Sequence, residues 1–131
     1  MIKPSYYIDT RDLPNNDLTY NGVTSEYVFQ ILAKSKADSV MAPYVPVGIA
    51  YVNPMEYSGE AYLEWIEFLT PFRGKHLLGP VMEQISSTFG KLYFEAVEGT
   101  EKKYEAIGAV AHELDADTGN MKYHFDVKEL N

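Results

Sequence analysis

The chain has 131 residues, 46% of them hydrophobic, and a formal net charge of −8, so we expect one domain over residues 1–131 around a single core. It has no cysteine, which excludes a disulfide scaffold, a thiolate nucleophile and a thiolate metal site, and is typical of a cytoplasmic protein. The acidic charge argues against a nucleic-acid partner, and no apolar run is long enough to predict a membrane span.

The N-terminal third predicts a strand, a turn region and a helix. Residues 5–10 can form the strand, and residues 12–17 together with Asn21-Gly22 are turn formers. Thr24 or Ser25 can cap a helix that ends near Asp38. The apolar face of that helix would carry Tyr27, Val28, Ile31 and Leu32.

Two short strands, at residues 39–44 and 47–52, are predicted to follow as a hairpin. A strand over residues 61–68 comes next, with apolar side chains interleaved among glutamates. From Leu77 to Phe89 the apolar spacing changes to three and four, which predicts a helix that begins near residues 76–79. Between them, residues 71–76 form a basic turn with a glycine, so free backbone N–H groups there could bind an anion.

The C-terminal part predicts a strand at residues 91–97, a short helical segment ending at residues 104–109, and two further strands. His112 and His124 lie on those two strands, around a hairpin turn at residues 115–120. A zinc pair would need a third ligand, which the sequence does not provide nearby. Two ordinary strand histidines are therefore the favoured interpretation.

Residues 46–127 resemble the GCN5-related N-acetyltransferase (GNAT) family. Two short anchors carry the resemblance: the loop Arg73-Gly74-Lys75 before the helix, which is similar to the family's acetyl-CoA loop, and Tyr104-Glu105-Ala106-Ile107-Gly108, which is similar to its Tyr-Glu-Lys-Leu-Gly-Phe. The resemblance implies an α/β (α+β) fold with a mixed, mostly antiparallel central sheet of six or seven strands flanked by helices.

The resemblance also implies acetyl-CoA as the co-substrate, with no metal. The positions carried over for its binding are Phe68, Leu69, Arg73, Gly74, Lys75, His76, Leu77, Leu78 and Gly79. Aligned without a gap, His76 and Leu78 stand where the family has glycine and glycine or alanine, and Gly79 follows one place late. Those glycines allow a diphosphate to approach the backbone closely.

Two carboxylates and one tyrosine are the candidate catalytic groups. With a pKa of about 10.4, an alkylammonium needs a base before it can attack a thioester, and the resemblance implies a carboxylate on the central strand. Glu64 and Glu67 are there, on opposite faces of a regular strand unless a bulge intervenes. Glu64 is favoured because it shares its face with polar neighbours, although both glutamates could simply be solvated. Tyr104 is the candidate acid for the leaving thiolate, and a packing role is its alternative.

The predicted function is transfer of an acetyl group from acetyl-CoA to the primary amine of a small molecule or peptide, by direct attack. An acidic surface suits a cationic substrate, and the alternative interpretation is that the acidic charge keeps the protein soluble. The alternative is a catalytically inactive GNAT-fold binding or regulatory protein, and a third hypothesis is a phosphate-ligand domain unrelated to acyl transfer. The segment between the first two strands is short, so the acceptor pocket is either open or completed by a partner chain, as in a homodimer.

Overall fold

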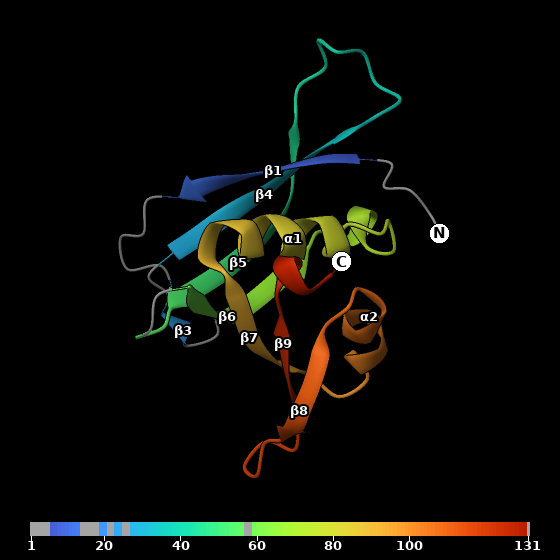
Figure 1. Cartoon of the computed structure of the whole chain (residues 1–131). Coiled ribbons are helices and arrows are strands. Elements are labelled where there is room, and N and C mark those ends of the chain that lie inside the picture. Colours follow the sequence, from blue (N-terminus) through green and yellow to red (C-terminus); the bar gives the residue numbers. More distant parts are fainter. Residues whose placement is uncertain (1–5, 14–18, 21–22, 25–26, 57–58, 131) are drawn as a thin grey trace.

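A computed structural model describes residues 6–13, 19–20, 23–24, 27–56 and 59–130 of the chain. They form a seven-stranded sheet in the order β1-β4-β5-β6-β7-β9-β8, and a separate β2–β3 hairpin (Figure 1). The strands are β1 (Tyr6–Leu13), β2 (Thr19–Tyr20), β3 (Val23–Thr24), β4 (Tyr27–Ser35), β5 (Val45–Pro54), β6 (Glu60–Phe68), β7 (Lys91–Ala96), β8 (Val110–Leu114) and β9 (Met121–Phe125). The helical elements are η1 (Thr70–Phe72), α1 (Leu78–Phe89), α2 (Glu101–Ala106) and η2 (Val127–Glu129).

The sheet is mixed and mostly antiparallel, as predicted. Its one parallel pair in the described chain is β6–β7, and it is short: residues 60–62 pair with residues 91–93, and no pairing follows. The C-terminal ends of the two strands therefore diverge. Because β6 pairs with β5 and β7 pairs with β9 on their outer edges, the two inner edges face each other across a gap.

The connection from β6 to β7 confirms the predicted strand, turn and helix. Helix α1 begins at Leu78, within the expected range, and its apolar stripe of Val81, Met82 and Ile85 is buried in the core. Gly90 ends the helix with φ 91°, and a Cβ there would lie 2.0 Å from the carbonyl oxygen of Gly59. Only glycine allows this close approach at the start of β7.

The predicted helix between Thr24 and Asp38 is wrong, because the described part of this segment forms strand β4. Phe29, Ile31 and Ala33 alternate along β4 and are buried, which is the period of a strand rather than of a helix. Strand β4 pairs with β1 on one edge and with β5 on the other. Sheet pairing on both edges decided the structure over the local helical signals.

The predicted strand at residues 39–44 is also wrong, since residues 36–44 form the connection between β4 and β5. The strand predicted at residues 47–52 is confirmed within β5, and the hairpin that forms is β4–β5. Strand β1 confirms the described part of the first predicted strand and extends through Leu13. The turn region predicted at residues 12–17 is wrong for residues 12 and 13, which belong to β1 and pair with β4. The rest of it, residues 14–17, and Asn21-Gly22 lie outside the described residues.

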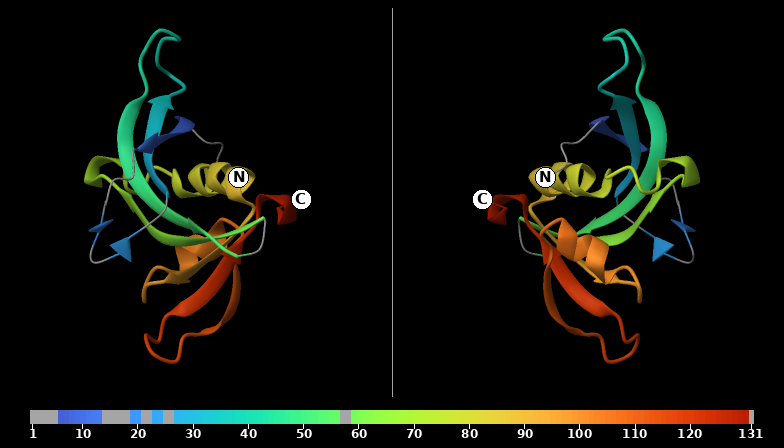
Figure 2. Two further views of the ribbon diagram at one scale, coloured as in Figure 1. Left: turned by 90° about the vertical axis from the view of Figure 1, so that its left-hand side faces the viewer. Right: turned by 90° about the vertical axis from the view of Figure 1, so that its right-hand side faces the viewer.

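Figure 2 shows α1 on one side of strands β4 and β5 and the β2–β3 hairpin on the other. In the described part of the chain, no helix precedes η1, so the helix predicted between the first two strands is absent there. Nor does the described chain contain a helix with the length and apolar character needed to span a bilayer.

Candidate functional site

Two adjoining cavities lie where β6 and β7 diverge. The first has a volume of about 730 Å³ and the second of about 300 Å³, and small-molecule sites typically have volumes of about 300–1,000 Å³. Both are lined by Trp65, Ile66, Lys103 and Tyr104. A molecule bound in one cavity can therefore meet a molecule bound in the other.

The first cavity is formed by the end of β6, the loop that follows it, the first turn of α1 and helix α2. Of the positions predicted to bind the cofactor, those in its lining are Phe68, Arg73, Gly74, His76, Leu77, Leu78 and Gly79. Leu69 and Lys75 are outside that lining. The first amides of a helix have no partner within the helix and lie at its positive end, so this wall suits an anionic ligand.

The loop before α1 has two residues in the left-handed region. Gly74 has φ 74° and His76 has φ 60°, so His76 adopts a backbone conformation that glycine favours. Arg73 fastens the loop to β6: its Nε donates to the Phe68 carbonyl oxygen at 3.0 Å, and its guanidinium lies 3.8 Å from the Glu67 carboxylate. The Arg73 side chain is still 59% exposed.

A β-bulge separates the two candidate bases. Tyr51 of β5 is opposite Trp65, whereas the next residue, Val52, is opposite Leu63, so Glu64 is the extra residue of β6. Beyond the bulge, each side chain of β6 points to the face opposite the one that a regular strand would give it. Glu67 therefore lies on the same face as Tyr62, and the opposite faces expected for Glu64 and Glu67 in a regular strand do not apply. Glu64 lines the second cavity and Glu67 lines the first. Asn53 donates to the Glu64 carboxylate at 3.3 Å.

Tyr104 lies on α2, where the two cavities meet. The residue is only 8% exposed, and its ring centroid is 4.7 Å from that of Phe94. Burial raises the pKa of its hydroxyl above the ordinary value, so the group stays protonated at neutral pH. Within the described chain no hydrogen bond satisfies this hydroxyl.

Glu95 and Tyr62 belong to the second cavity and were not predicted from the sequence. The Tyr62 hydroxyl donates to Glu95 across the gap at 3.3 Å, and the Thr118 hydroxyl donates to the same carboxylate at 2.8 Å. Burial, followed by the charges of Glu95 and Glu64, raises the pKa of Tyr62 to about 12. The sequence shows that Lys91, Tyr93 and Glu95 alternate with apolar residues along β7. It does not show how β7 is aligned with β6, and this register places Glu95 near Tyr62.

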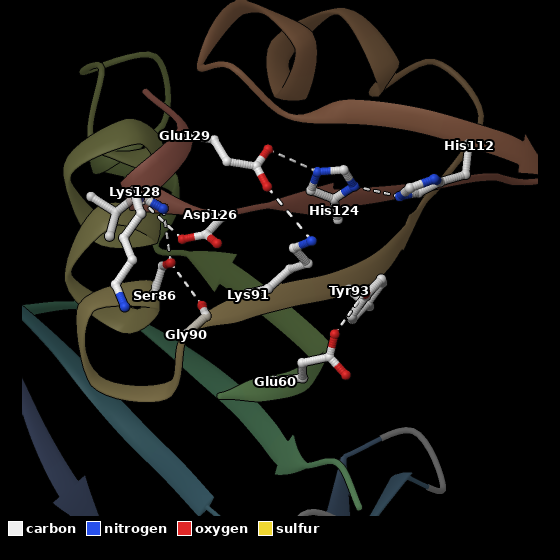
Figure 3. Close-up of polar contacts among 11 residues, drawn as sticks. Glu60, Ser86, Gly90, Lys91, Tyr93, His112, His124, Asp126, Lys128 and Glu129 are labelled. Carbon is white, nitrogen blue, oxygen red and sulfur yellow. Dashed lines mark hydrogen bonds and ion pairs between the residues drawn. The ribbon is translucent and has the colours of Figure 1, made fainter. Parts of the chain in front are cut away.

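The two strand histidines form a separate polar cluster outside both cavities (Figure 3). A ring nitrogen of the buried His124 contacts one of the exposed His112, and His124 Nε2 lies 3.1 Å from Glu129 Oε2. Lys91 Nζ lies 3.6 Å from the other oxygen of Glu129. His124 holds the pKa of the Glu129 carboxyl below its usual value. No group of three or more metal-ligating side chains that could hold a metal occurs among the described residues.

No family model matches the sequence, and no curated protein matches it. Solved structures do match. A domain from Methanocaldococcus jannaschii has a TM-score of 0.66 at 12% identity, covering 92% of this chain and 99% of that one. The spermidine/spermine N-acetyltransferase SpeG from Vibrio cholerae has a TM-score of 0.60 at 11% identity, covering 94% and 96%. A GNAT-family protein from Desulfovibrio desulfuricans, provisionally named an acetyltransferase, has a TM-score of 0.53 at 22% identity, covering 76% and 69%. The chain therefore has the GNAT fold.

Proposed function

We propose that the protein is an N-acetyltransferase, which transfers the acetyl group of acetyl-CoA to the primary amine of a small molecule or peptide by direct attack. One observation carries this proposal: two cavities of different chemistry meet at the gap between β6 and β7. One has the loop and first turn of α1 in its wall, and the other has a half-buried glutamate. Solved structures with a similar fold include acetyltransferases, which supports the same reaction class.

The first cavity would hold acetyl-CoA. Its diphosphate would bind the amides of residues 73–79 and the positive end of α1. The departures from the family's glycines fit this role, because His76 keeps a glycine-like backbone and Leu78 packs partly against the core. Beyond residues 62 and 93, where β6 and β7 stop pairing with each other, their inner edges line the gap and can offer backbone groups to the amides of the pantetheine arm.

The second cavity would present the acceptor amine to the thioester that acetyl-CoA supplies. Glu64 accepts a proton from the ammonium group, directly or through water, and leaves the nitrogen lone pair free to attack. As the C–N bond forms and the C–S bond breaks, Tyr104 donates its proton to the departing sulfur. Glu67 is the less suitable base because Arg73 lies beside its carboxylate.

Thermal unfolding with acetyl-CoA, CoA and ATP tests this proposal, followed by turnover with a panel of amines. A ligand that binds only the folded state stabilises it by about 2.7 kcal/mol at a hundredfold excess over Kd. We expect acetyl-CoA and CoA, but not ATP, to raise the melting temperature with increasing concentration. The absence of a shift at millimolar ligand would refute acetyl transfer. A shift without turnover of any amine would instead support the inactive binding protein.

A further inference from the structure

The second cavity presents two half-buried carboxylates from two different strands, Glu64 on β6 and Glu95 on β7. Among the described residues, neither carboxylate is in an ion pair. Lys122 is directly opposite Glu95 on β9, but its Nζ pairs with Asp115 at 3.5 Å. Partly desolvated charges without a counterion are unfavourable, so this cavity favours a cationic ligand.

A second, independent observation points to a ligand in the same place. Tyr104 lines the cavity, is more than nine-tenths buried, and has a hydroxyl without a hydrogen-bond partner among the described residues. The Tyr104 hydroxyl oxygen is not among the fully buried atoms that lack a partner in the described chain, so it is accessible from the cavity. A polar molecule within the cavity would provide that partner.

Glu95 is held in place by groups from outside its own strand. Tyr62 donates to one of its oxygens and Thr118 to the other. A carboxylate has about four acceptor positions, so these two bonds orient Glu95 and leave positions for further donors. The one cationic side chain in the cavity lining, Lys103, is exposed at the rim, with its Nζ 5.6 Å from the centre of the Tyr104 ring.

The wall of the cavity also includes apolar side chains, among them Leu63, Trp65 and Phe94. Apolar surface and separate carboxylates together suit a ligand with a methylene chain and a cationic group at each end. A single ammonium group could neutralise only one of the two carboxylates.

We propose that Glu95 determines acceptor specificity by binding a second ammonium group, so that the acceptors are diamines with one amine at Glu64 and the other at Glu95. The inference rests on the proposed acetyl transfer and adds the acceptor class to it. Glu95 is a binding residue in this scheme, and the proton transfers remain with Glu64 and Tyr104.

The test compares putrescine with n-butylamine, the monoamine of the same chain length, in the wild type, Glu95→Gln and Glu98→Gln. Glutamine keeps the size of Glu95 and removes its charge. Its amide oxygen can still accept from one of the two hydroxyls of Tyr62 and Thr118, and its NH₂ group can donate to the other. Glu98 is an exposed control outside the cavity lining. Calorimetric binding of each amine is measured alongside kcat/KM, so that one readout does not require turnover. Unchanged melting temperatures confirm that the variants fold.

We expect the wild type and Glu98→Gln to prefer putrescine by about tenfold or more, the size of a charge-assisted hydrogen bond. Glu95→Gln should lose that preference, mainly through KM, and keep its kcat/KM for n-butylamine. Equal use of both amines by the wild type, or an equal loss for both in Glu95→Gln, would overturn the inference and leave acetyl transfer standing. Glu95-dependent putrescine binding without any turnover would refute acetyl transfer and keep the dication site. No binding of putrescine would overturn the inference.

Discussion

The two cavities that meet beside Trp65 and Tyr104 differ in the chemistry of their walls. The first is built around a loop and a helix start, which offer backbone amides, and Arg73 in its wall bonds to the Phe68 carbonyl oxygen of β6. The second is built from side chains on two strands, with Glu64 and Glu95 as its charged groups from the sheet. Backbone recognition tolerates side-chain replacement, whereas recognition by carboxylates does not. Substitutions in the two cavities should therefore change different kinetic quantities.

The largest effect is expected for Glu64→Gln, which removes the base from the second cavity. We expect kcat to fall by about 10²–10⁴-fold, the usual contribution of a general base, with the Kd for acetyl-CoA unchanged. The measurement is kcat as a function of pH, with Glu98→Gln as the control. A greater loss of kcat in Glu67→Gln than in Glu64→Gln would place the base in the first cavity. The two cavities would then not have the separate roles proposed for them.

Tyr104→Phe tests the residue shared by both cavities. We expect kcat to fall by about ten- to a hundredfold, below the full range for acid catalysis because a thiolate is a comparatively good leaving group. The free energy of unfolding should change by less than about 1 kcal/mol, because phenylalanine fills the same space and no bond in the described chain is lost. Steady-state kinetics measures the change in kcat, and urea unfolding measures the change in the free energy of unfolding. A large loss of stability with normal kcat would show a packing role.

The part of the fold that the sequence predicted well is the segment from β6 through α1 to β7. Its apolar period changes from two to about three and a half at Leu77, and the loop between is marked by Gly74, so each element could be recognised locally. Strand β4 could not be recognised from its local sequence. Val28 on one face and Phe29 and Ile31 on the other are all buried, which removes the alternation of a half-exposed strand and leaves a spacing that a helix can share.

The site was predicted only where a local pattern marked it. Tyr104 and the loop residues belong to short motifs, and the structure brings most of them to the first cavity. Glu95 was missed because its importance depends on the register between β6 and β7, which joins residues more than thirty positions apart. The bulge at Glu64 was missed for the same reason, since only the pairing with β5 reveals the extra residue.

The smallest effect, and the one that belongs to the first cavity, is expected for His76→Gly. A left-handed backbone costs a residue with a Cβ about 1–2 kcal/mol, and glycine removes this strain at φ 60° while opening room near the loop amides. Greater freedom of the unfolded chain offsets part of the gain in folding stability, and the room opened near the loop amides should lower the Kd for CoA by a few-fold. Gly74→Ala is the matched opposite: φ is 74° there and nothing lies within 4 Å of an added Cβ, so the strain should lower the free energy of unfolding, and the Kd for CoA should rise only as far as the loop leaves this conformation. Calorimetric titration of both variants with CoA measures this, and neither should change the preference between putrescine and n-butylamine. A changed preference between the two amines would mean that the loop of the first cavity also shapes the acceptor site. Substitutions in one cavity would then alter binding in the other.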